Sequence, residues 1–284
     1  MWLFIDERYR DVLNRAGLRA VADFMAFSRG DVVKRLPTKT IVRLELESPT
    51  GRRRYFLKRH AGPVRWRERL RALCSGFSPS WGRKEWEVIR AFERSGIPTM
   101  TPVAAGERRC GRGYESFVMT EELTGFRSLE TLVPARYAPP LDAAAIAEKR
   151  AMIRRVADLT RRLHGAGFNH RDWYLCHIFT RQAEDGTWPL RVLDLQRVDR
   201  RRWLRRRWIV KDLAALNYSA PPGVVTIRDR ARFLKAYLDD GRALGEHRAL
   251  IRAIVRKTAR IRRHDARLQR NRRSSQAAAA SPAT

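Results

Sequence analysis

The spacing of hydrophobic residues changes along the chain between the helical period and the alternating period of a strand. Residues 40–46 alternate apolar and charged side chains, and residues 55–58 form a second apolar run after a Ser-Pro-Thr-Gly turn. This pattern predicts a β-hairpin. Over the first 120 residues the pattern predicts a helix over 7–28, the hairpin over 40–58, an irregular basic segment over 65–82, a helix over 83–95 and a strand over 116–120.

The rest of the chain is mainly helical by the same criterion. Asp142 is the expected N-cap of a helix that ends at Gly165, because one stripe of this segment is apolar. Short strands over 178–180 and 191–193 flank an Asp-Gly turn, and further helices follow. The last twenty residues lose the pattern, so we expect a basic, disordered tail over 265–284.

Composition places the chain among folded proteins with an anionic partner. Hydrophobic residues make up 44% of its 284 residues, which excludes a disordered protein. The formal net charge of +30 indicates nucleic acid, an anionic membrane surface or a phosphorylated substrate as the partner. An Arg-rich genome would also contribute to this charge, and composition does not separate the two causes.

Three scattered cysteines, Cys74, Cys110 and Cys176, give no metal-binding or disulfide pattern and fit a reducing compartment. The first residues form too short an apolar run for a signal peptide, and no stretch approaches the roughly 20 apolar residues of a membrane-spanning helix. We therefore expect a cytoplasmic protein that is peripheral to a membrane.

The strongest chemical signal is the stretch His-Arg-Asp-Trp-Tyr-Leu-Cys-His over residues 170–177. In kinases, the Asp of H-R-D-x-x-x-x-N accepts the proton of the acceptor hydroxyl, and the residue five places later helps to bind metal. Asp172 takes the first position, and His177 stands where Asn is usual. The triplet alone is weak in a chain this rich in Arg, so its context decides.

That context supplies the remaining groups of a phosphoryl-transfer site in kinase order. Lys58 ends a strand and is a candidate phosphate ligand, Glu85 on the next helix is its candidate partner, and Asp194 after a strand is a candidate magnesium ligand. Each has an ordinary alternative: a solvated strand end, an acid favoured by the helix dipole, and a turn residue. Their joint order and placement favour the kinase interpretation.

These segments together resemble the lipopolysaccharide core heptose kinase family, which is related to the Kdo kinases. The resemblance runs from about Gly30 to about Tyr237 and rests on the segments 55–60, 85–86, 170–177, 194–197 and 211–213. It implies an α+β, protein-kinase-like fold with two lobes, a small antiparallel-sheet lobe over 1–122 and a mainly helical lobe over 123–264. It also implies phosphorylation of an inner-core heptose with ATP and Mg²⁺, at the cytoplasmic face of the inner membrane of a Gram-negative bacterium.

The resemblance also implies the role of each site residue. Its assignments are Lys58 as the ATP lysine, Glu85 as its partner, Asp172 as the base, Asp194 as the metal ligand, Asp212 as the acid behind the catalytic loop, and the hinge from Glu121 to Leu123 as the adenine contact.

Two departures from ordinary kinases are visible. No G-x-G-x-x-G is present, so residues 30–40 must cover the phosphates with Lys or Thr groups and backbone N–H. His177 is a poorer magnesium ligand than Asn because hard cations favour oxygen, which leaves one or two metal ions open. Its ordinary alternative is a core histidine.

The charge suggests partners. The basic segments 65–71 and 200–208, which contain tryptophan, suit an anionic headgroup surface, or are simply solvated faces. The expected partners are the lipid A–core acceptor and the membrane, with a lipid or acyl carrier left open. Two alternatives remain: a kinase for another small molecule or a protein, and a nucleic-acid-binding protein, for which no zinc-finger, homeodomain or RRM pattern is present.

Overall fold

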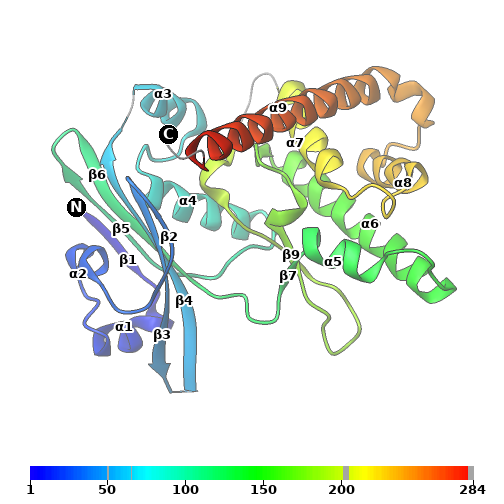
Figure 1. Ribbon diagram of the computed structural model, residues 1–284. Coiled ribbons are helices and arrows are strands. Elements are labelled where there is room, and N and C mark those ends of the chain that lie inside the picture. The colour runs from blue at the N-terminus through cyan, green and yellow to red at the C-terminus, as the bar shows by residue number, and fades with distance from the viewer. Residues whose placement is uncertain (50, 65, 201–204, 281–284) are drawn as a thin grey trace. The chain divides into compact units, whose positions relative to one another are not determined.

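The computed structural model describes residues 1–49, 51–64, 66–200 and 205–280. The chain divides into two compact units, each built from two segments (Figure 1). Unit 1 contains Met1–Phe126 and Thr180–Arg201, and unit 2 contains Arg127–Phe179 and Arg202–Thr284. The sequence placed the first boundary at 122/123, four residues before the break at Phe126, and did not foresee that residues 180–201 return to unit 1.

Unit 1 is built on an antiparallel six-stranded sheet with the order β1-β5-β6-β4-β3-β2. The predicted hairpin is confirmed, and its strands are longer than expected. The strands are β1 (Trp2–Ile5), β2 (Asp31–Leu36), β3 (Lys39–Ser48), β4 (Gly51–Pro63), β5 (Pro102–Cys110) and β6 (Gly113–Glu121).

One face of this sheet is covered by two short helices, α1 (Arg10–Arg15) and α2 (Val21–Ala26). The alternation in β3 buries Val42 and Leu44, and Phe24 of α2 stacks on Phe117 of β6 with ring centroids 4.1 Å apart. The prediction of a single helix over 7–28 is wrong. Gly17 adopts a φ of +77° just after α1, a left-handed conformation that glycine adopts readily and that interrupts a helix.

Helix α4 (Trp81–Arg94) also packs on β6 and β5. Gly82 makes this approach possible, because a Cβ at that position would lie 2.7 Å from the backbone nitrogen of Phe117. The same helix buries Val88, Ile89 and Phe92. The close contact of α4 with the sheet fixes the position of the buried Glu85 side chain relative to the strands.

The expected irregular segment over 65–82 is wrong in its first part, because Trp66–Ser75 form helix α3. Trp66, Leu70 and Leu73 recur at i, i+4 and i+7, which is a helical period that the alternating arginines obscured. Arg65 lies outside the described residues.

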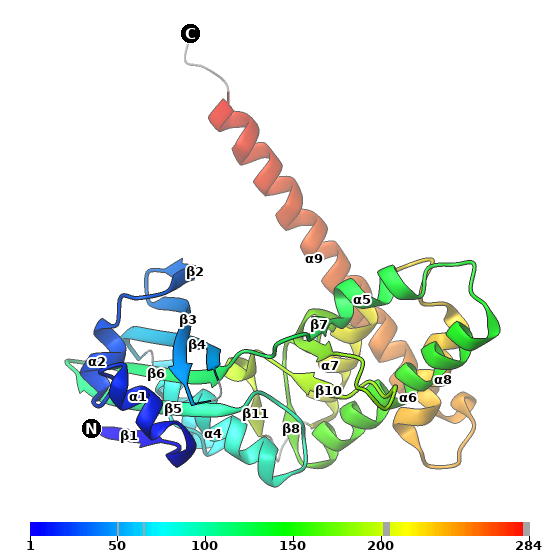
Figure 2. The same ribbon diagram turned by 90° about the horizontal axis from the view of Figure 1, so that it is seen from below.

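Unit 2 is mainly helical, with α7 packed against α9 and α6 against α8. The predicted N-cap is confirmed, since the Asp142 carboxylate accepts the N–H of Ala145 at 2.7 Å. Figure 2 shows α9 as one continuous helix that extends to Ala280, through most of the expected tail. The helices are α5 (Leu129–Arg136), α6 (Ala143–Gly165), α7 (Arg205–Ser219), α8 (Ile227–Leu238) and α9 (Arg248–Ala280).

The remaining strands are short: β7 (Arg127–Ser128), β8 (Phe168–Asn169), β9 (Ile178–Thr180), β10 (Leu190–Val192) and β11 (Asp199–Arg200). The antiparallel sheet and the helical second unit confirm the predicted α+β class. Among the described residues, no helix is both long enough and apolar enough to span a bilayer.

Candidate active site

Lys58 and Glu85 form a buried ion pair in unit 1. The Nζ of Lys58 lies 2.6 Å from Oε1 of Glu85, and the Glu85 side chain is fully shielded from solvent. Burial alone would lower the pKa of Lys58, but the charge and hydrogen bond of Glu85 and the nearby Asp194 raise it above its ordinary value. Lys58 therefore carries a fixed positive charge, which suits a phosphate ligand.

Asp194 follows β10 and begins the short 3-10 turn Leu195–Arg197. Its backbone is left-handed, with φ 56° and ψ 61°, a conformation that Asp tolerates better than most residues. The preceding strand is tethered to the segment between α4 and β5, since Thr99 donates from Oγ1 to the carbonyl of Val192 at 2.6 Å. The Asp194 carboxylate is close enough to Lys58 for its charge to help raise the pKa of that lysine.

Gln196 connects this cluster to two further side chains that the sequence analysis did not single out. Its Nε2 donates to Oε2 of Glu85 at 2.9 Å and to Nε2 of His60 at 3.1 Å. Its Oε1 accepts from Nζ of Lys39 at 2.8 Å. Gln196 stands where the Asp-Phe-Gly motif of ordinary kinases has its glycine. Its one neutral amide connects the ion pair, the start of β3 and the segment after Asp194.

His60 is neutral in this network. Burial and the positive charges of Lys39 and Lys58 lower its pKa to about 3. Because its Nε2 accepts the Gln196 N–H, the ring proton lies on Nδ1. A protonated His60 would lose this acceptor and repel both lysines.

Lys39 begins β3 directly opposite His60, on the same face of the sheet as Lys58. Burial and repulsion by Lys58 lower the pKa of Lys39. Its Nζ donates a hydrogen bond to the amide oxygen of Gln196, which carries no charge. The only sequence signal was the excess of Lys and Thr in residues 30–40, which did not single out Lys39.

The predicted hinge lies at the end of β6. The N–H of Glu121 donates to the carbonyl of Thr101 at 3.0 Å, so Glu121 can offer a ligand its carbonyl but not its N–H. Among the bonds of the described residues, none uses the N–H of Leu123. This spacing of an acceptor and a donor two residues apart fits the edge of an adenine ring.

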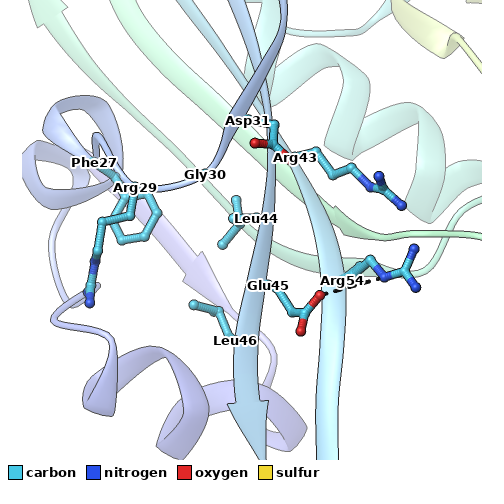
Figure 3. Close-up of a pocket in the computed structure, with 9 residues that line it drawn as sticks. All are labelled: Phe27, Arg29, Gly30, Asp31, Arg43, Leu44, Glu45, Leu46 and Arg54. Carbon is cyan, nitrogen blue, oxygen red and sulfur yellow. Dashed lines mark ion pairs between the residues drawn. The ribbon is translucent and has the colours of Figure 1, made fainter.

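A hollow of about 360 Å³ lies along β3 in unit 1, and none of the predicted site residues lines it (Figure 3). Its wall mixes charged and apolar groups, and Glu45 and Arg54 form an ion pair across 3.7 Å. It is a charged surface hollow distinct from the lysine cluster. The lining residues are Phe27, Arg29, Gly30, Asp31, Arg43, Leu44, Glu45, Leu46 and Arg54.

The candidate catalytic loop, residues 170–177, lies in unit 2 and is held by hydrogen bonds to Asp212 of α7. The two oxygens of the buried Asp212 carboxylate accept the backbone N–H groups of His170 at 2.8 Å and Arg171 at 2.7 Å. Arg171 has a φ of 71°, and the Nζ of Lys211 donates to its carbonyl. These bonds hold Arg171 in a left-handed backbone conformation immediately before Asp172. They therefore fix the direction in which the Asp172 side chain points.

Two further contacts shape this loop. Trp173 is fully buried and donates from Nε1 to Oγ1 of Thr160 at 3.0 Å. Trp208 packs its ring under Arg171, with Cζ 5.2 Å from the ring centroid. Trp208 of the basic segment 200–208 thus supports the loop, while residues 201–204 lie outside the described residues.

His177 is oriented by the same loop. Its Nδ1 donates to the carbonyl of Asp172 at 2.7 Å, which leaves Nε2 as the nitrogen with the lone pair in the neutral ring. A histidine fixed in this way by a backbone carbonyl is typical of metal ligands, although nitrogen suits Mg²⁺ poorly.

No three His, Cys, Asp or Glu side chains gather as a ready-made metal site within the described part of the chain. Magnesium in phosphoryl-transfer enzymes is usually held by one or two carboxylates together with the substrate phosphates. The carboxylate of Asp194 beside two lysines fits that donor set, and the lysines fit the phosphates of a nucleotide.

A strand lysine held by a buried helical glutamate, with an aspartate at the end of another strand, is the arrangement of protein-kinase-like phosphotransferases. Residues 26–237 match the model of the lipopolysaccharide kinase (Kdo/WaaP) family. The chain belongs to this family, which confirms the prediction from the sequence.

Known relatives agree with this assignment. A Pseudomonas aeruginosa protein named lipopolysaccharide core heptose(I) kinase WaaP is 37% identical over 217 residues, which cover 74% of this chain and 77% of that protein. A protein of the same name from Escherichia coli K12 is 36% identical over 215 residues, covering 73% and 77%. A solved structure described as WaaP in complex with acyl carrier protein has a TM-score of 0.71 and 32% identity, and the match covers 92% of this chain and 99% of that one.

The neutral state of buried His60 makes stability depend on acidity. Between pH 6.5 and about 3 the unfolded chain binds a proton that the folded chain does not, so stability falls as pH falls through this window. Between pH 7 and pH 4.5 the free energy of unfolding should fall in both proteins. We expect this fall to be about 2–3 kcal/mol smaller in His60→Gln than in the wild type. Urea unfolding at a series of pH values measures this slope.

His264→Gln, on the exposed surface of α9, is the matched control and should follow the wild type. Parallel pH profiles for the wild type and His60→Gln would show that His60 is not buried in the neutral form.

Proposed function

We propose that this protein transfers the γ-phosphoryl group of ATP to a hydroxyl of a heptose in the lipopolysaccharide core. The observation that carries the proposal is the buried 2.6 Å pair of Lys58 and Glu85 beside Asp194. The names of the relatives supply the acceptor: heptose(I) of the lipopolysaccharide core is the substrate in both relatives described above.

Each side chain then has a defined task. ATP supplies the phosphoryl group, and a divalent cation offsets the charge on its phosphates. Lys58 binds the α- and β-phosphates and is oriented by Glu85. Asp172 accepts the proton of the sugar hydroxyl, and Asp212 holds the backbone that presents Asp172.

The cation we assign is Mg²⁺, with Asp194 as its carboxylate ligand. His177 is proposed as a second ligand through Nε2, because Nδ1 is engaged by the Asp172 carbonyl. Adenine is proposed to bind the hinge through the carbonyl of Glu121 and the N–H of Leu123.

The place of action we propose is the cytoplasmic face of the inner membrane, where the protein is peripheral. The acceptor carries lipid A and is therefore held in a bilayer. The high positive charge of the chain favours an anionic surface of this kind.

An acyl carrier is the second partner we propose, on the strength of the relative's complex with acyl carrier protein. Unit 2 contains an open pocket of about 550 Å³ that is lined by residues of α5, α6, α7, α8 and α9. Its wall is mainly aliphatic, which suits the alkyl chain that such a carrier brings. Among the lining residues are Met152, Ile153, Val156, Leu213, Leu216, Ala231, Leu234, Ile251 and Ile254.

Replacing the proposed base separates binding from chemistry. We expect Asp172→Ala to bind Mg-ATP as the wild type does and to lose about 10²–10⁴-fold in phosphoryl transfer, which is the usual contribution of a general base. Calorimetric titration with Mg-ATP and a transfer assay on core oligosaccharide measure the two quantities. Asp158→Ala, on the surface of α6, is the control. Transfer at the wild-type rate by Asp172→Ala would remove the assignment.

Lys39 is proposed as a second phosphate ligand that replaces part of the missing glycine-rich loop. We expect Lys39→Met to weaken the binding of a non-hydrolysable Mg-ATP analogue by about tenfold or more, because it loses a charged hydrogen bond. Lys34→Met removes an exposed lysine from the same hairpin and should change the affinity little. Equal losses in the two variants would mean that only the general field of the hairpin acts on the nucleotide.

Filling the cavity of unit 2 tests the acyl carrier. We expect Ala231→Phe to abolish the preference for acylated over unacylated carrier protein, because the new ring occupies space needed by the alkyl chain. Ala266→Phe, on the exposed part of α9, should retain it. Surface-immobilised carrier in both forms gives the affinities. A preference that survives in Ala231→Phe would exclude this cavity as the acyl site.

A further inference from the structure

Helix α3 (Trp66–Ser75) exposes an apolar face that the rest of unit 1 leaves uncovered. Trp66, Leu70 and Leu73 are 66%, 51% and 82% exposed. Their spacing of i, i+4 and i+7 puts them on one side of the helix. They are three of the ten exposed large hydrophobic side chains among the described residues, and they lie on a single ten-residue helix.

The opposite side of α3 is the one turned toward the protein. Ser75 is buried, and Glu68 and Ala72 are half-buried. Cys74 is exposed and lies on the same side as the apolar face. The helix is therefore amphipathic in the opposite sense to a normal surface helix: its large apolar groups face outward and its small and polar groups face inward.

The charge of this segment of the sequence indicates what covers the apolar face. The chain has arginine at positions 65, 67, 69 and 71, and only Glu68 carries the opposite charge among residues 64–75. Arg69, on the described surface, is exposed. An apolar stripe with tryptophan among arginines is the composition of a helix that lies in the plane of an anionic bilayer, with the ring at headgroup depth and the cations on phosphates.

The length of α3 fits the same geometry. Ten residues of helix extend about 15 Å, half the thickness of a hydrocarbon core, so α3 can lie in the interface but cannot cross it. Trp66, Leu70 and Leu73 are short enough to enter only the headgroup and upper acyl region.

We propose that the outward face of α3, formed by Trp66, Leu70, Leu73 and Cys74, is the surface by which this protein inserts shallowly into an anionic lipid bilayer. The proposal rests on the proposed action at a membrane and names the element responsible. It needs no nucleotide and no phosphoryl transfer.

Vesicle flotation with the full chain tests the affinity. Wild-type protein should float with vesicles of phosphatidylcholine and phosphatidylglycerol and bind vesicles of phosphatidylcholine alone much more weakly. Leu70→Gln with Leu73→Gln should lower the partition constant about tenfold or more, because two largely exposed leucines then no longer enter the apolar layer. The control pair Ile227→Gln with Leu268→Gln removes exposed apolar groups from unit 2 and should stay within about twofold of the wild type.

A fluorescent label reports the position directly. A polarity-sensitive dye on Cys74 in a Cys110→Ser background should shift to the blue when anionic vesicles are added. The same dye on Cys110 in a Cys74→Ser background should not shift. Both cysteines are exposed in the free protein, and the half-buried Cys176 is common to the two backgrounds, so any label on Cys176 contributes equally to both.

Equal vesicle binding by the α3 variant and the wild type, or no shift at Cys74, would overturn the proposal. Loss of affinity for acyl carrier protein in the α3 variant, with vesicle binding intact, would assign the face to that protein and also overturn it. Transfer to soluble core oligosaccharide is measured in parallel: its absence in the wild type contradicts the proposed function, whereas the vesicle results decide the role of α3.

Discussion

The nucleotide half of the site depends on placing an ammonium and a carboxylate together where water cannot reach the carboxylate. A buried ion pair of this kind is costly to assemble, and removing one partner typically destabilises a protein by about 3–5 kcal/mol because a buried charge is left alone. In unit 1 the packing of strands and helix holds the two side chains in place, so that the ion pair can form. The register of β3, β4 and β6 sets Lys58, and the contact of α4 with β6 at Gly82 sets Glu85.

Gln196 connects the buried ion pair to two side chains that lie outside it, Lys39 and His60. An amide has two donors and an acceptor, so one neutral side chain satisfies Glu85, His60 and Lys39 without adding charge. A glycine at this position could do none of this. Lys39, at the start of β3 in the segment that has no glycine-rich loop, therefore finds a polar partner in the glutamine that follows Asp194.

The sequence predicted those features that depend on short-range pattern or on kinase order. The hairpin, the N-cap at Asp142 and the neighbourhood of Lys58, Glu85 and Asp194 follow from such signals. The Gln196 network was not predicted because its partners are 111 to 157 residues away, so no local pattern connects them. The prediction of one helix over 7–28 was wrong because the chain turns at Gly17. Helix α3 was missed because alternating arginines obscured the helical spacing of its apolar residues. The outward apolar face of α3 is visible only once burial is known.

We propose that this chain adds a phosphate to the heptose region of the lipopolysaccharide core and that the pair of Lys58 and Glu85 is indispensable to that step. The most direct measurement is the mass spectrum of core oligosaccharide from a deletion strain complemented with the wild-type gene, with Lys58→Met or with Glu85→Gln. We expect the deletion strain to lack one core phosphate, the wild-type gene to restore it and neither variant to do so. A core with unchanged phosphate in the deletion strain would contradict the function, and full restoration by Lys58→Met would contradict the site.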